Sequence, residues 1–216
     1  MAHETVKLQG YLKQTQSKYS TIATEVDTNI QQKNSLNAEI NRLSRQIDGI
    51  ELEMSNVQNQ LDNIHIPDYD EDDPEGSMAA IRQAEQERAM LQARLKALSA
   101  QAQRLRQEQE GKKAQLQRVL KALQKLKGLC SDRIHALSVL RAAFLENAQK
   151  SQAAAQPLAH MASSVRFGAA AASGASNSAS ARAAENRQGA EDSMRLIQMF
   201  QQLIERIDGG QRERER

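Results

Sequence analysis

Apolar residues recur in the first part of the chain at alternating steps of four and three. Between Leu8 and Ile64, 14 of the 17 positions in this series carry an apolar side chain. The three exceptions are Thr15, Asn29 and Lys33. An average step of about 3.5 residues keeps one face of a helix directed at a partner helix. The pattern therefore predicts a first coiled-coil helix over residues 1–66.

A second series with the same spacing runs from Ile81 to Phe144. It is apolar at 15 of 19 positions when Ala84, Ala102 and Cys130 are counted. This series predicts a second coiled-coil helix over residues 77–156. Two apolar faces of similar length need partners, and each is the simplest partner for the other.

The segment between the two series, residues 67–76, reads PDYDEDDPEG. Proline interrupts helices, and carboxylates stabilise the positive N-terminal end of a following helix. We therefore expect an acidic hairpin tip here, with Ser77 as the N-cap of the second helix. The predicted fold class is all-α: a long antiparallel two-helix coiled-coil hairpin, an Ala-rich segment and a short amphipathic C-terminal helix.

A reversal centred on the tip also predicts which residues face each other. In one register Lys33 lies opposite Lys112 and Leu36 opposite Gln109, whereas in another Asn29 lies opposite Gln109. Either register gathers the polar residues of both apolar series into one zone. We expect the hairpin to be weakest there, because Gly111 also lies in this zone and polar seam residues lower stability.

The pattern changes after residue 156. Pro157 is expected to break or kink the second helix. Residues 157–190 are rich in Ala, Ser and Gly, and this composition fits either a flexible linker or a thin helix packed through small side chains. Residues 191–208 predict an amphipathic helix, and residues 209–216 a disordered charged tail that begins at a Gly pair.

The apolar face of the predicted C-terminal helix needs a packing partner. Because the two long helices already cover each other's apolar series, they offer no obvious second groove. We therefore predict docking on a protein partner or on copies of the same chain. The intramolecular alternative is the overhanging end of the second helix around Leu137, Leu140, Phe144 and Leu145. The predicted docking residues are Met194, Ile197, Phe200, Leu203, Ile204 and Ile207.

The acidic tip carries a second candidate surface. Acidic residues at alternate positions resemble the start of an EF-hand calcium loop, but Asp73 stands where that loop needs Gly and Ala79 where it needs Glu. A solvated loop that caps a helix is the simplest interpretation, and a docking surface is the alternative. The docking candidates are Asp68, Tyr69, Asp70, Asp72 and Asp73.

No catalytic, cofactor-binding or metal-binding motif is found in the sequence. The four histidines form no pair at helical spacing, and the single Cys130 fits a small buried side chain. Residues 77–127 are basic, with 12 Lys or Arg against 4 Asp or Glu. These cations are spread around the helix without interleaved aromatic side chains, so the pattern favours a solvated face over nucleic-acid binding.

Taken together, these features predict a nonenzymatic coiled-coil scaffold or adaptor subunit of a larger assembly. Its partners would be proteins, as a homo-oligomer or a hetero-complex, without a cofactor. A cytoplasmic location is the default expectation, because the N-terminus shows no signal-peptide core, and leaderless secretion stays open. The rival interpretation is a secretion-associated or membrane-active helical protein, and the third is a coiled coil that binds nucleic acid.

Overall fold

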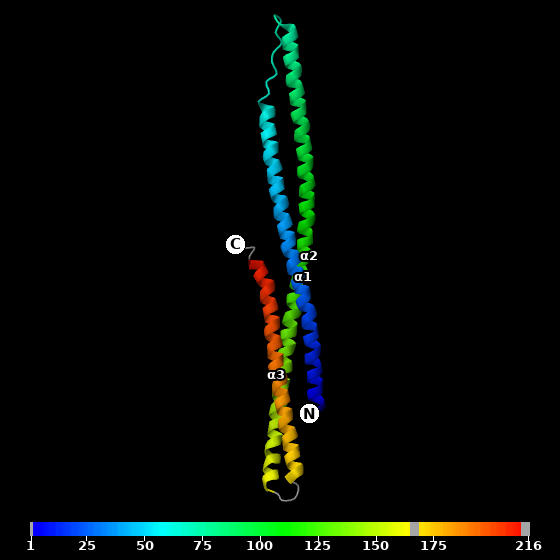
Figure 1. Cartoon of the computed structure of the whole chain (residues 1–216), viewed down its shortest axis with the longest axis vertical. Coiled ribbons are helices and arrows are strands. Elements are labelled where there is room, and N and C mark those ends of the chain that lie inside the picture. The colour runs from blue at the N-terminus through cyan, green and yellow to red at the C-terminus, as the bar shows by residue number, and fades with distance from the viewer. Residues whose placement is uncertain (1, 165–168, 213–216) are drawn as a thin grey trace. The chain divides into compact units, whose positions relative to one another are not determined.

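The computed structural model describes residues 2–164 and 169–212, and within these ranges the chain is all-helical, with no strand. Its three helices are α1 (Ala2–Asp62), α2 (Pro74–Ser164) and α3 (Ala169–Arg212) (Figure 1). The prediction of an all-α fold is confirmed. In this described part of the chain, no helix is both long enough and apolar enough to cross a membrane.

The chain divides into two compact units. Unit 1 consists of Met1–Gln31 and Lys121–Arg216, and unit 2 consists of Gln32–Leu120. α1 and α2 contribute to both units, whereas α3 belongs to unit 1 alone.

Unit 2 is a pair of helical segments that run in opposite directions. Its core contains Ile50, Val57, Leu98 and Ala102, with Leu95 and other half-buried apolar side chains packed around them. The exposed edges carry ion pairs between the two segments. Arg94 contacts Glu53 at 2.5 Å, Lys112 contacts Glu39 at 2.5 Å, and Arg106 pairs with Glu51. The ammonium of Lys112 lowers the pKa of the Glu39 carboxyl.

The positions selected by the alternating spacing are the ones that the structure buries. Every position of the first series, from Leu8 to Ile64, is buried or half-buried, including Lys33, which is 5% exposed. In the second series only Arg88 is exposed. Burial of these faces removes apolar surface from water, which is the main favourable contribution to pairing.

The predicted register is wrong. Gln109 donates a hydrogen bond to Ser44 at 2.7 Å, and Lys112 pairs with Glu39, so neither residue lies opposite Lys33, Leu36 or Asn29. The cause is the asymmetric reversal: α1 ends at Asp62, before the predicted 66, and non-helical chain continues to residue 73. The polar residues of the two series are therefore not gathered opposite each other.

Unit 1 is a bundle of three helices. α3 runs parallel to α1, since Thr5 bonds to Asn186 and Tyr19 contacts Phe200. It runs antiparallel to α2, since Ser176 bonds to the carbonyl of Ala155 while Lys127 bonds to Asp208. The expectation that the long helices offer no second groove beyond the overhang is therefore wrong, because α3 packs against both of them.

The size of the side chains that α3 buries inside unit 1 changes along the helix. Near its C-terminal end α3 buries large side chains, and nearer its start it buries Ala179, Ala183, Asn186, Ala190 and Ser193. These small residues continue the same steps of four and three toward the N-terminal end of α3. Of the two interpretations left open for residues 157–190, the packed thin helix is the one observed, from Ala169 onward.

Three predicted helix boundaries are corrected. Pro157 lies inside α2, which runs on to Ser164 instead of ending at 156. A proline in a helix interior costs about 3 kcal/mol, and beside it Ser176 of α3 donates a hydrogen bond to the carbonyl of Ala155. Residues 191–208 are the C-terminal part of α3 and not a separate helix, and α3 passes through the Gly pair to Arg212. The rest of the predicted tail, residues 213–216, lies outside the described residues.

Candidate functional site

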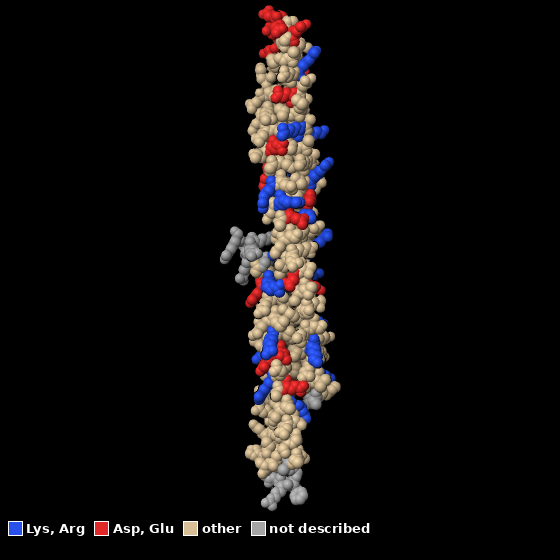
Figure 2. All heavy atoms as spheres, in the orientation of Figure 1, with Lys and Arg blue, Asp and Glu red and all other residues tan. Residues whose placement is uncertain are grey.

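The acidic tip is a non-helical segment, residues 63–73, that joins α1 to α2 within unit 2. Figure 2 shows Asp and Glu side chains gathered at this loop, at the top of the view. The Tyr69 side chain is 55% exposed beside Asp68 and Asp70. Among the described residues, no carboxylate of the tip forms an ion pair with Lys or Arg. The tip therefore carries a concentrated negative charge that the rest of the described chain does not neutralise.

Two of the predicted docking carboxylates have local structural roles. The Asp73 carboxylate accepts a hydrogen bond from the N–H of Gly76 at 3.1 Å. The backbone carbonyl of Asp73 accepts one from the N–H of Ser77 at 3.1 Å. Asp73 is thus the N-cap of α2 and Pro74 its first residue, so the prediction of Ser77 as N-cap is wrong. Proline explains the shift, because its fixed φ suits the first helical position. Asp70 accepts the N–H of Asp72 at 3.0 Å.

Gly76 allows Asp73 to fold over the helix terminus. A Cβ at Gly76 would lie 2.1 Å from the Oδ2 atom of Asp73, which is too close for any side chain unless the carboxylate moves. Of the predicted docking residues of the tip, Asp68, Tyr69 and Asp72 have side chains that form no hydrogen bond or ion pair with another described residue. These three are the best-placed side chains for recognition of a partner.

The predicted docking face of the C-terminal helix lies mostly inside unit 1. The buried members are Ile197, Phe200, Leu203 and Ile207, each at most 6% exposed. The Phe200 ring meets Tyr19 of α1 edge to face, with ring centroids 5.1 Å apart. Ile204 is half-buried, and only Met194 is substantially exposed, at 41%. This apolar face is therefore covered by α1 and α2 of the same chain. The predicted intramolecular alternative had named α2 alone.

Polar contacts fix α3 against its two neighbours. Lys127 of α2 donates to both carboxylate oxygens of Asp208, at 2.7 and 2.9 Å. Arg206 pairs with Asp27 of α1. Inside the bundle, Asn186 accepts a hydrogen bond from Thr5 at 3.3 Å. These contacts set the position of α3 along the other two helices.

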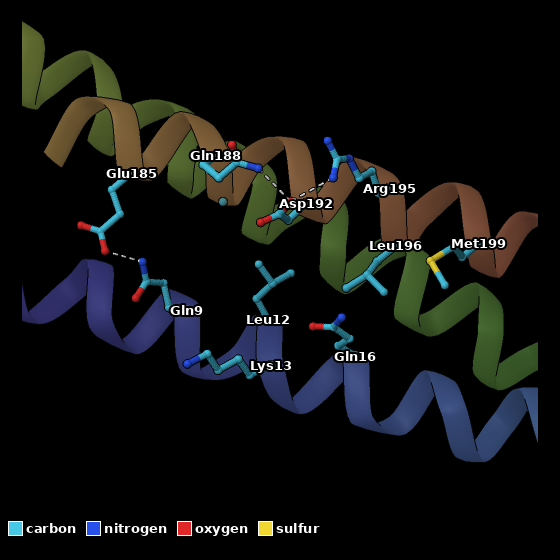
Figure 3. A pocket seen from close by; sticks show the side chains of 11 residues that line it. Gln9, Leu12, Lys13, Gln16, Glu185, Gln188, Asp192, Arg195, Leu196 and Met199 are labelled. Atoms are coloured by element: carbon cyan, nitrogen blue, oxygen red, sulfur yellow. Dashed lines mark hydrogen bonds and ion pairs between the residues drawn. The ribbon is translucent and has the colours of Figure 1, made fainter. Parts of the chain in front are cut away.

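A groove of about 590 Å³ lies between α1 and α3 (Figure 3). Leu12 and Leu196 point into it from the two helices, and Gln9 bridges to Glu185 at 2.6 Å. The walls also carry charges of both signs, from Lys13 and Arg195 on one hand and Glu185 and Asp192 on the other. Because its charges balance, the groove shows no preference for a charged ligand.

A smaller groove of about 250 Å³ lies between α2 and α3 on another side of unit 1. Its lining residues are Arg141, Leu145, Arg187, Ala190, Glu191 and Met194. Sequence reasoning missed this groove, because its two walls come from segments far apart in the chain. The sequence had singled out two of its lining residues separately, Met194 as a docking residue and Leu145 in the intramolecular alternative.

The described residues hold no group of three or more His, Cys, Asp or Glu side chains placed to bind a metal ion. Cys130, expected to be buried, is 0% exposed, and burial raises the pKa of its thiol. Comparison with known proteins gives no relative: no family model, curated protein or solved structure matches the chain.

Proposed function

We propose that this chain is a nonenzymatic scaffold or adaptor subunit, built on a coiled-coil hairpin, that binds a protein partner through its acidic tip. The coiled-coil part of the proposal is supported by the alternating burial along α1 and α2 and by the ion pairs at their edges. α3 then acts as a structural helix that completes the bundle of unit 1.

The observation that carries the proposal is the exposed tyrosine and the unpaired carboxylates of the tip. Tyr69 is 55% exposed among carboxylates that have no cationic partner in the described chain. Aromatic side chains are enriched at protein interfaces, and unneutralised charge increases the rate of association with an oppositely charged surface. We expect the partner surface to be basic, with a cavity for the tyrosine ring.

Site-specific photocrosslinking in the native host tests this function. A photoreactive amino acid replaces Tyr69 in the full chain, and the matched control replaces Tyr11, which is 63% exposed in unit 1. We expect Tyr69 to give a defined adduct that Tyr11 does not give. Equal adducts from both positions would show that the tip has no special role.

A charge variant provides the second arm. Replacing Asp68, Asp70, Asp72 and Asp73 with Ser removes four negative charges, while Ser at position 73 can still cap α2. We expect the helical circular dichroism signal to be retained and the Tyr69 adduct to be lost. An undiminished adduct in this variant would contradict charge-assisted docking.

A further inference from the structure

The groove between α2 and α3 combines an apolar floor with positive charge. Leu145 is 37% exposed and Met194 41% exposed, and Ala190 lies between their helices as a small buried residue. An open volume of about 250 Å³ suits a single inserted side chain better than a whole helix. Methionine adapts its shape to a partner, and its sulfur makes favourable contacts with aromatic rings.

The two arginines of this groove form no ion pair with another residue in the described part of the chain. Arg141 forms no ion pair or hydrogen bond with any described residue. Arg187 donates a hydrogen bond to Gln152, which is uncharged. Glu191 supplies the single negative charge of the lining, so the groove is positive overall.

The tip has the complementary combination. Tyr69 supplies one large exposed side chain, and residues 67–76 supply six carboxylates and no cation. An arginine fork can bind a carboxylate through two hydrogen bonds. The phenol ring matches the apolar floor, and Asp68 and Asp72 match the arginines.

We propose that the acidic tip of one copy of this chain docks into the α2/α3 groove of a second copy. This inference rests on the proposed function of the tip and names its partner. The surfaces that meet are different, so the contact is of the head-to-tail kind, and a pair of copies keeps one free tip and one free groove through which further copies can add. Assembly should therefore grow with protein concentration and weaken as salt screens the charges.

Two variants of the full chain separate the two halves of the contact. The groove variant is Arg141→Glu with Arg187→Glu, and the tip variant is Asp68→Lys with Tyr69→Ala and Asp72→Lys. We expect each alone to sediment as a monomer, with association weakened at least roughly tenfold relative to the original chain. Mixed in equal amounts, they should form a dimer, since the groove variant supplies an intact tip and the tip variant an intact groove.

Arg104→Glu with Arg118→Glu is the matched control, because both residues are exposed on α2 and lie outside the groove. This control should assemble like the original chain, and circular dichroism should show equal helicity for all variants. An original chain that stays monomeric at low salt, an oligomer that neither variant disrupts, or a mixture that stays monomeric would each overturn the inference. Any of these results combined with a specific Tyr69 adduct would leave the proposed function intact and reject only the second copy as partner.

Discussion

Replacing Gly189 with Ala should destabilise the protein, although the same change usually stabilises a helix. A Cβ built at Gly189 lies 2.6 Å from Cε1, 2.7 Å from Cζ and 2.9 Å from Cδ1 of Phe144. The Phe144 ring is 0% exposed, so it has no solvent-filled space into which it can move. α3 and α2 can approach this closely only because residue 189 lacks a side chain.

The expected magnitude follows from two opposing effects. Ala in place of Gly in a helix contributes about 0.5 to 1 kcal/mol of stability. Overpacking a core costs about 1 to 3 kcal/mol. Because the clash involves ring atoms of an enclosed side chain, we expect the cost to exceed the gain and the free energy of unfolding to fall by about 1 to 2 kcal/mol.

Gly174→Ala is the matched control in the same helix. No atom lies within 4 Å of the Cβ position at Gly174, so this variant should gain about 0.5 to 1 kcal/mol. Urea denaturation followed by circular dichroism measures both. In the Gly189→Ala background, Phe144→Leu should cost less than it does alone, because the two changes compensate. If Gly189→Ala proved as stable as Gly174→Ala, the close approach of α3 to Phe144 would be refuted.

Three further predictions concern the two units. Leu43→Asp places a charge where the side chain is 1% exposed, so it should lower the free energy of unfolding by more than about 3 kcal/mol, and a smaller loss in urea denaturation would contradict burial of that face. The Cys130 thiol is buried with a raised pKa, so its thiolate is scarcer than that of free cysteine at the same pH. Iodoacetamide should therefore label it only as urea unfolds the chain, and rapid labelling of the native protein would argue against burial. Lys127→Ala and Asp208→Ala should show a coupling of about 0.5 to 1 kcal/mol in a double-mutant cycle, because the pair is only partly exposed, and no coupling would indicate that the contact does not form in solution.

The helical class and the buried faces of α1 and α2 follow from the sequence itself. A 3.5-residue repeat of large apolar side chains directs one face of each helix toward a partner wherever that partner lies. For the same reason Cys130 could be assigned to the interior, since it continues the repeat between Leu126 and Leu137. The repeat states which face is buried and does not state what buries it.

The register depended on the tip, where local rules compete. Both Ser77 and Asp73 are good N-cap residues, and only the folded loop shows that Asp73 caps α2 ahead of Pro74. That choice places the start of α2 at Pro74, whereas the pairing of α1 with α2 follows from the early end of α1 at Asp62 and the non-helical chain up to residue 73. An acidic loop around Tyr69 could be read from the sequence, whereas the pairing of Gln109 with Ser44 could not.

The position of α3 was decided by tertiary structure alone. Ala179, Ala183 and Ser193 keep the spacing of a buried face. In an Ala-rich segment, however, small residues at these positions are expected for a flexible linker as much as for a packed helix, so the sequence does not distinguish the two. Their burial becomes favourable only because α1 and α2 already present a groove into which a thin helix fits. The α2/α3 groove with Arg141 and Met194 exists for the same reason, since contacts between distant segments form it and no local pattern encodes them.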